Sequence, residues 1–161
     1  MHVIKRTIVL SAPIADVFSF FQDPRNLAGI TPRWMGFDIT HVDEGGMRDG
    51  FKIVHRIKWM DVSLRWVTRI KDYDPPHGFL DVQTSGPYKV WRHQHTFEET
   101  ARGTVMRDLV RYELPFGILG EVAHVLVVRR QLTRIFNYRS RRIAQLFTSL
   151  DAADAAPATV S

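Results

Sequence analysis

The hydrophobic patterns along this 161-residue chain predict an α+β fold built on one antiparallel sheet of about seven strands. Three observations support this prediction. Segments in which apolar and polar residues alternate fill residues 36–114 and are separated by turn residues, which is typical of antiparallel strands. A similar segment, residues 2–10, stands apart near the N-terminus. A long segment with apolar residues at helical spacing, residues 121–148, follows the strands.

The expected order of elements is one strand, two short helices, six strands and one long helix. Ser11 is expected to cap the first helix, which ends at Asp23-Pro24, and residues 25–30 are expected to form the second. The six later strands are predicted at residues 36–43, 51–59, 62–73, 79–84, 88–98 and 104–114.

The composition is that of an ordinary globular domain, with 45% hydrophobic and 24% charged residues. No apolar run is long enough to span a membrane, and Lys5 and Arg6 interrupt the apolar residues where a signal peptide would lie. The chain has no cysteine, which excludes disulfides and cysteine nucleophiles, and a cytoplasmic location is expected. Residues 1–150 are expected to form a single domain and residues 151–161 a disordered tail.

The net charge of +5 is concentrated in the predicted long helix, where residues 121–150 carry six arginines and one acidic residue. A solvated helix face is the simplest interpretation, and contact with an anionic partner or membrane surface is the alternative. Nucleic-acid binding is not expected, because the aromatic residues are predicted to face inward.

Two neighbouring strands carry most of the residues that could do chemistry. Alternation places Trp91, His93, His95 and Phe97 on one face of the first strand, and Met106, Asp108, Val110 and Tyr112 on one face of the second. If the loop 98–103 closes a hairpin, His93 lies roughly opposite Asp108, and His95 lies opposite Met106. The result is a polar cluster within an apolar sheet face.

Two earlier strands extend this face. Their inward residues are predicted to be Phe51, Ile53, His55, Ile57 and Trp59, then Leu64, Trp66, Thr68 and Ile70. The opposite positions are rich in lysine and arginine, which indicates that they face solvent. The inward faces together form a bowl of aromatic and aliphatic groups with a few polar ones, which suits the wall of an internal ligand cavity.

Several short motifs occur in a consistent order along residues 2–148. They are Ser11-Ala12-Pro13 with Val17-Phe18, Asn26-Leu27 before Thr31-Pro32, Gly86-Pro87-Tyr88 with Trp91-x-His93-x-His95-x-Phe97, Gly103-Thr104, Asp108, Tyr112-x-Leu114-Pro115-Phe116-Gly117 and Phe136-x-Tyr138-Arg139. In this order the chain resembles the START-like, or SRPBCC, superfamily, including its polyketide cyclase/dehydrase branch. It looks most like the small stand-alone bacterial proteins that are described as ligand-binding or cyclase/dehydrase-like.

The resemblance implies a helix-grip fold, in which a curved antiparallel sheet surrounds a long C-terminal helix and leaves a cavity between them. Members bind lipids, polyketides, hormones or other hydrophobic molecules, and only some of them are catalysts, so the fold alone does not decide the function. The resemblance brings no metal with it, and we expect neither a metal site nor another cofactor.

The expected function is binding of a small hydrophobic molecule of lipid-, aromatic- or polyketide-like chemistry. The residues expected to contact it are His55, Trp59, Trp66, Trp91, His93, His95, Phe97, Asp108, Tyr112, Phe116 and Arg139. Arg139 is expected either to bind a carboxylate or to pair with an internal acid. The glycine-containing segment 115–120, which includes Phe116, is expected to form a mobile lip of the cavity.

Three alternatives remain open at this stage. The first is a cyclase or dehydratase in which His93 and Asp108 act as an acid–base pair and Tyr112 donates to a developing enolate. A zinc site on His93 and His95 is a second, although no signature of fixed spacing supports it. The third is a lipid or quinone chaperone that docks on a membrane through its arginine-rich helix.

Overall fold

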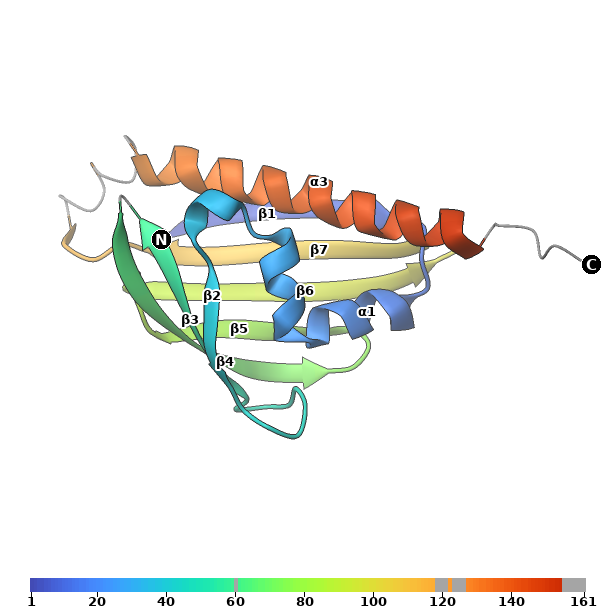
Figure 1. Cartoon of the computed structure of the whole chain (residues 1–161), viewed down its shortest axis with the longest axis horizontal. Coiled ribbons are helices and arrows are strands. Elements are labelled where there is room, and N and C mark those ends of the chain that lie inside the picture. Colours follow the sequence, from blue (N-terminus) through green and yellow to red (C-terminus); the bar gives the residue numbers. More distant parts are fainter. Residues whose placement is uncertain (60, 118–121, 123–126, 155–161) are drawn as a thin grey trace, which may run out of the picture.

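In the computed structural model, a seven-stranded antiparallel sheet curves around a long C-terminal helix (Figure 1). The structure describes residues 1–59, 61–117, 122 and 127–154, with side chains described as far as residue 148. Its elements are β1 (His2–Leu10), α1 (Ile14–Gln22), η1 (Pro24–Ile30), η2 (Arg33–Met35), β2 (Asp38–Val42), β3 (Lys52–Trp59), β4 (Val62–Asp74), β5 (Gly78–Ser85), β6 (Val90–Thr100), β7 (Gly103–Glu113) and α3 (Arg129–Asp154). The predicted α+β class and the order of its elements are confirmed.

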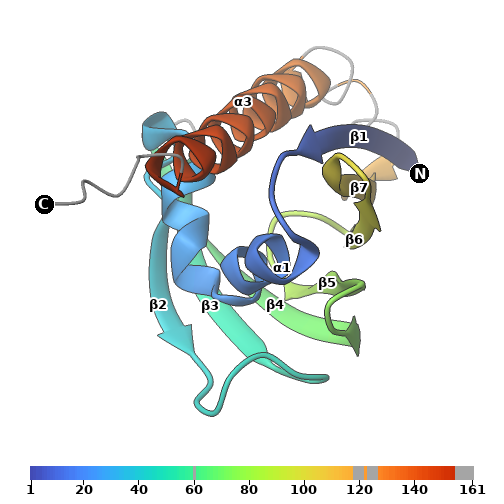
Figure 2. The same ribbon diagram turned by 90° about the vertical axis from the view of Figure 1, so that its right-hand side faces the viewer.

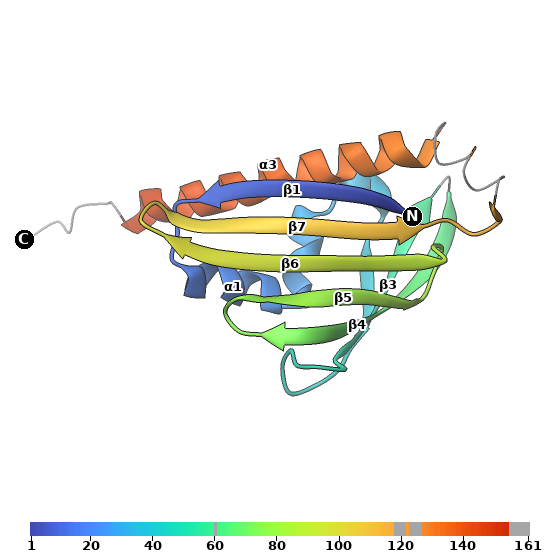
Figure 3. The same ribbon diagram turned by 180° about the vertical axis from the view of Figure 1, so that it is seen from behind.

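The strand order in the sheet is β1-β7-β6-β5-β4-β3-β2, with every neighbouring pair antiparallel. The first and last strands pair along their whole length, from His2 opposite Tyr112 to Leu10 opposite Thr104. Figure 2 shows the sheet bent into an arc with α1 and α3 on its concave side, and Figure 3 shows the convex side without a covering helix. The functional interior therefore lies between the concave face and α3.

Strand burial follows the predicted alternation. Along β7, every second residue from Thr104 to Tyr112 is buried, whereas Arg107 and Arg111 between them are exposed. Folding removes the apolar side chains of the concave face from water. Each fully buried valine- or methionine-sized side chain contributes about 1.5 to 3 kcal/mol to the stability of the fold. The predicted assignment of inward and outward faces holds for this strand.

The space between sheet and helices is filled unevenly. At one end, α1 inserts Phe18 and Phe21, whose ring centroids lie 5.7 Å and 5.4 Å from that of Phe97. These rings belong to a solid apolar cluster that also contains Ile143 and Phe147 of α3. No residue of α1 lines the space at the other end, where Leu132 and Phe136 of α3 belong to a second apolar cluster with Val110 and Tyr112 of β7. This uneven filling leaves room for a cavity.

The β6–β7 hairpin differs from the prediction in its register. Thr100 pairs with Gly103, so the turn has two residues, and His95 rather than His93 lies opposite Asp108. The expected opposition of His93 to Asp108, and of His95 to Met106, is therefore wrong by two residues. Because side chains alternate with a period of two, a shift of two keeps every one of them on its expected face.

Two further predictions need correction at the helix ends. The backbone of Pro13 caps α1 without a side-chain hydrogen bond, so Ser11 is not its cap. Helix α3 continues to Asp154, so the first four residues of the predicted tail are helical. The rest of that tail, 155–161, and positions 121 and 123–126 of the predicted long helix lie outside the described residues. Among the helices described, none is long and apolar enough to cross a membrane.

Candidate ligand-binding cavity

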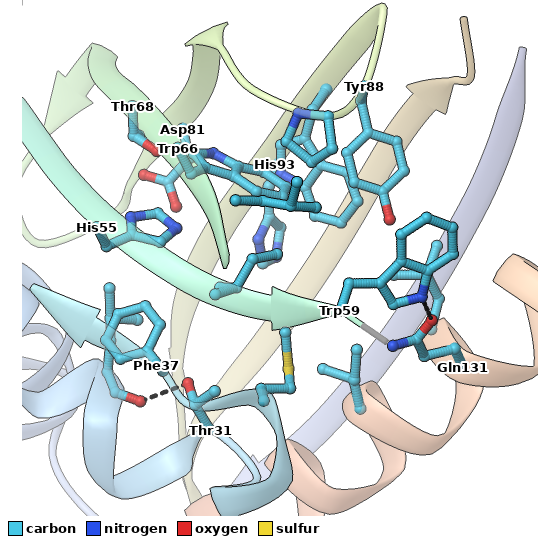
Figure 4. Close-up of a pocket in the computed structure, with 18 of the residues that line it drawn as sticks. Thr31, Phe37, His55, Trp59, Trp66, Thr68, Asp81, Tyr88, His93 and Gln131 are labelled. Atoms are coloured by element: carbon cyan, nitrogen blue, oxygen red, sulfur yellow. Dashed lines mark hydrogen bonds between the residues drawn. The ribbon is translucent and has the colours of Figure 1, made fainter. Parts of the chain in front are cut away.

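A cavity of about 190 Å³ lies between the concave face of the sheet and the first half of α3. The sheet contributes side chains from β3 to β6, and η1, η2 and α3 close the opposite side (Figure 4). Most of the lining is apolar, with Leu132, Ile135 and Phe136 of α3 facing Ile53 and Ile57 of β3. Such a lining favours a hydrophobic ligand.

Aromatic rings in mutual contact form one wall of this cavity. The imidazole of His55 stacks on Trp66, with ring centroids 5.5 Å apart and an interplanar angle of 22°. Trp66 then meets Trp91 edge-on at 5.1 Å, and Trp91 lies 4.7 Å from Tyr88. Phe37 covers the other side of His55 at 5.0 Å. Rings packed in this way hold one another in place, so the wall is largely preformed.

Polar side chains gather at two places in the lining. His55, Thr68, Asp81 and His93 lie together at one side in Figure 4. At the other side, Trp59 of β3 donates a hydrogen bond of 2.6 Å from Nε1 to Oε1 of Gln131. This second contact ties the tip of the β3–β4 hairpin to α3 and satisfies the indole N–H of a half-buried ring. The first group carries the chemistry of the site.

Behind His93, a buried network of imidazoles and carboxylates crosses three strands. Asp108 Oδ1 lies 3.0 Å from His93 Nε2 and 2.8 Å from His95 Nδ1. The second contact is poorly aligned for a hydrogen bond and acts through charge. His95 Nε2 lies 3.3 Å from Asp81 Oδ2. His95 is therefore held between two carboxylates.

The two neighbouring histidines are driven to opposite charge states. Burial alone would lower the pKa of His95, but its contacts with Asp108 and Asp81 outweigh that cost and raise the pKa to about 9. For His93, burial and the adjacent His95 outweigh the attraction of Asp108 and lower the pKa to about 4. At neutral pH His95 is an imidazolium, and His93 is neutral with an Nε2 proton donated to Asp108.

The remaining charges complete this balance. Burial opposes ionisation of both carboxyl groups, but the neighbouring histidines outweigh it and hold the pKa values of Asp81 and Asp108 below their usual range. The guanidinium of Arg139 also lines the cavity, and its charge is felt by both carboxylates. Two anions thus face two cations, His95 and Arg139. Burial lowers the pKa of His55 to about 4, so it is neutral in the cavity wall.

Asp81, His93 and His95 also fit the donor requirements of a metal ion, because one ligand atom from each lies within 4.8 Å of the others. A cation bound there would need the imidazolium of His95 to lose its proton. It would also meet the charge of Arg139, which already acts on His93 and Asp81. The charge of Arg139 and the proton on His95 therefore favour a protonated His95 over a bound metal ion at this place.

The structure brings six of the expected ligand-binding residues to the cavity. Four of them supply its wall from the sheet, His93 contributes from the polar side, and Arg139 contributes from α3; the six are His55, Trp59, Trp66, Trp91, His93 and Arg139. They come from β3, β4, β6 and α3, so the concave face predicted from alternation is the face that lines the cavity.

The other five do not line it. His95 and Asp108 are buried behind His93, where they set its charge and orientation. Phe97 belongs to the solid apolar cluster beneath α1. Tyr112 is buried in a separate apolar cluster with Val110, Leu132 and Phe136 and is not part of the lining, so its position does not support a role as proton donor to a ligand. Phe116 is 82% exposed and points away from the lining. Residues 118–120 of the predicted lip lie outside the described residues.

Asp81 is the main residue that the sequence analysis missed. It lies on β5 directly opposite His93, on the same face as Phe79, and it lines the cavity. Asp81 is two residues from Phe79, so alternation along the strand predicts that both face inward, as do His93 and His95 on β6. Adjacent apolar residues Phe79 and Leu80 obscured that signal, because both are buried. Tyr88 and Gln131 were also missed as lining residues.

Comparison with known proteins agrees with the fold. Residues 10–137 match the model of the family described as polyketide cyclase / dehydrase and lipid transport. The match spans most of the chain, and the protein belongs to this family. A search of curated proteins found no match.

Solved structures show the same fold at low sequence identity. Protein Ms6760 from Mycobacterium smegmatis is 20% identical, with a TM-score of 0.64 over 92% of this chain and 92% of the other. A START superfamily protein from the same organism is 13% identical, with a TM-score of 0.64 over 91% of this chain and 99% of the other. A nucleoside-diphosphate sugar epimerase from Corynebacterium glutamicum is 21% identical, with a TM-score of 0.68, and the similarity covers 94% of this chain but 30% of that one. The START-like fold class is thus confirmed.

Proposed function

We propose that this protein binds a small hydrophobic molecule in the cavity between its sheet and α3. The observation that supports this most strongly is a cavity of about 190 Å³ with a wall of Trp59, Trp66 and Trp91 and a small group of polar side chains at one side. An engineered apolar cavity of about 150 Å³ binds benzene, so the space here is enough for a ring-sized ligand. Membership of a family described by cyclase, dehydrase and lipid-transport functions agrees with such a role.

The test is binding of a neutral fluorescent probe, N-phenyl-1-naphthylamine, to the wild type and to two tryptophan variants. Leu64→Trp fills the cavity from β4, whereas Val62→Trp places the same side chain on the same strand at a position that is 58% exposed. We expect the first variant to lose at least about tenfold in affinity, since added side-chain volume excludes the probe. Equal binding by both variants, or no binding by the wild type, would contradict the proposal.

A cyclase or dehydratase activity is a second candidate, favoured by the 3.0 Å contact of His93 with Asp108 at the cavity wall. The low pKa of His93 makes it a weak base at neutral pH, so this geometry supports orientation of a ligand more than proton abstraction. His93→Ala separates the two roles. Loss of turnover with unchanged affinity would identify a catalyst, whereas a modest loss of affinity alone would identify an orienting group.

Exchange of the ligand at a membrane surface is a third candidate. It is favoured by Trp34, which is 49% exposed beside the cavity and lies 5.7 Å from the guanidinium carbon of Arg134. Sedimentation with phosphatidylserine vesicles at low salt tests this role. Binding that is lost when Arg129, Arg130 and Arg134 are changed to glutamine would support it, and no binding by the wild type would contradict it.

A further inference from the structure

Arg139 has buried hydrogen-bond donors that have no partner among the residues that the structure describes. Its Nε and Nη2 atoms are both buried without a hydrogen-bond acceptor among the described residues, although the guanidinium lines the cavity. Asp81 and Asp108 attract it through charge but accept no hydrogen bond from these two atoms. The side chain keeps its charge and its place beside Phe136, whose ring centroid lies 5.8 Å from the guanidinium carbon. Buried donors of this kind ordinarily have an acceptor.

The two unpartnered atoms lie on the same edge of the guanidinium. In planar arginine, the N–H bonds of Nε and Nη2 point to the same side, and this edge binds both oxygens of one carboxylate. The chain contains an example on its surface, where Arg25 Nε donates to Asp23 Oδ1 at 2.8 Å and Arg25 Nη2 donates to Asp23 Oδ2 at 2.9 Å. The side chain of Arg139 lines the cavity, and none of the carboxylates that the structure describes accepts a hydrogen bond from the corresponding edge.

We propose that the ligand is a hydrophobic carboxylic acid whose carboxylate pairs with Nε and Nη2 of Arg139. This inference rests on the proposed function and names the chemical class of its ligand. The apolar body of the acid lies against the tryptophan wall, and the carboxylate lies where α3 faces the polar side of the cavity. His55 supports this placement, because its Nδ1 is also buried in the lining without a partner and is available to a second polar atom of the ligand.

One added anion would bring this buried group of charges from neutral to −1. Asp81 and Asp108 are paired with His95 and His93 within the sheet, but only His95 is charged, so Arg139 balances the second carboxylate and the hydrogen bonds to the ligand must offset the added charge. Arg139 is the cation whose donors remain open. A carboxylate loses its hydrating water when it enters the cavity, and two charge-assisted hydrogen bonds to Arg139 compensate for that loss. An uncharged amide of the same shape makes weaker hydrogen bonds.

The experiment measures displacement of N-phenyl-1-naphthylamine by matched acids and amides at pH 7. The pairs are phenylacetate and phenylacetamide, 3-phenylpropionate and its amide, 2-naphthoate and its amide, and octanoate and its amide. We expect at least one acid to bind about 10- to 100-fold more tightly than its amide. Arg139→Gln should abolish this preference, so that each acid binds no more tightly than its own amide; the ratio within each pair is independent of any change in the affinity of the cavity as a whole. Arg139→Lys should restore only part of it, because lysine keeps the charge but loses the two-donor edge.

Arg141→Gln is the matched control, because this exposed residue removes the same charge from the same helix and should keep the preference for acids. Probe binding by Arg139→Gln shows that the variant is folded. If the probe binds and every acid equals its amide, the inference is overturned while the proposed function stands. If the wild type binds neither the probe nor any competitor, the proposed function itself fails. An equal loss of acid affinity in Arg141→Gln would assign the effect to overall charge and would overturn the inference.

Discussion

At the scale of single residues, the site depends on Asp108, which contacts two histidines and faces no solvent. A carboxylate buried without partners would be costly, and here His93 and His95 both stabilise it. The same contacts leave His93 neutral and His95 charged. The cavity wall therefore presents the neutral imidazole of His93, and the charged imidazole of His95 lies behind it.

This arrangement predicts distinct nitrogen signals for the two histidines at pH 7. His95 should show the pattern of an imidazolium, and His93 that of a neutral ring protonated at Nε2, because their pKa values are about 9 and about 4. Long-range ¹H–¹⁵N correlation spectra of the imidazole rings measure both. In Asp108→Asn, His95 should lose much of its preference for the charged form. Two neutral rings in the wild type would contradict the assignment.

The sequence was informative about which residues share a face and less so about which residues touch. Alternation alone placed His93 and Asp108 together on the concave side, because strand geometry leaves only two faces. It did not predict the two-residue turn at 101–102, since no Asn-Gly or similar turn signal marks it. Nor could alternation show that Phe97 lies under α1 rather than in the cavity. That division depends on where a helix packs, which is a tertiary effect.

At the scale of elements, the close approach of β5 and β6 holds the network in register. Gly78 of β5 pairs with Thr96 of β6, and a Cβ there would lie 2.3 Å from the carbonyl oxygen of His95. That oxygen belongs to backbone and cannot move aside without shifting the strand that carries both histidines. Asp81 on β5 and His95 on β6 extend from these paired strands, and Asp81 Oδ2 lies 3.3 Å from His95 Nε2.

Gly78→Ala is therefore expected to destabilise the protein by about 1 to 3 kcal/mol, as overpacking does elsewhere. The control is Gly29→Ala, where an added Cβ meets nothing within 4 Å and stability should be unchanged or slightly raised. Urea denaturation followed by tryptophan fluorescence gives both free energies of unfolding. Equal stability of the two variants would show that β5 and β6 accommodate the added Cβ, which would contradict the close contact at Gly78.

At the scale of the whole molecule, the histidines predict how stability depends on pH. The pKa of His95 is about 9 in the folded protein against an ordinary 6.5, so its contribution is complete below pH 6.5 and is lost as the pH rises through 9. The pKa values of His55 and His93 are about 4, so their contribution is present above pH 6.5 and is lost as the pH falls towards 4. Stability should thus be greatest near pH 6.5.

The expected loss is on the order of 3 kcal/mol on the alkaline side, where one histidine titrates, and up to about twice that on the acid side, where two do, since one pKa unit corresponds to about 1.4 kcal/mol. Melting temperatures measured from pH 4 to pH 9.5 at constant ionic strength report this loss of stability. His95→Gln should flatten the alkaline side and leave the acid side sloping, whatever its overall stability. A wild-type profile that is flat between pH 6.5 and pH 9 would show that His95 does not hold the charge assigned to it.

The four tryptophans of the chain can show whether the space beneath α3 binds a ligand. Trp59, Trp66 and Trp91 line the cavity, whereas Trp34 does not, so the chain contains its own control. The measurement is a titration of ¹⁵N-labelled protein with the acids and amides, observed at the four indole N–H signals. Binding in the cavity predicts that the three lining indoles shift with one common dissociation constant and that Trp34, which is outside the lining, shifts least. Shifts confined to Trp34, or no shift with any compound, would contradict the claim.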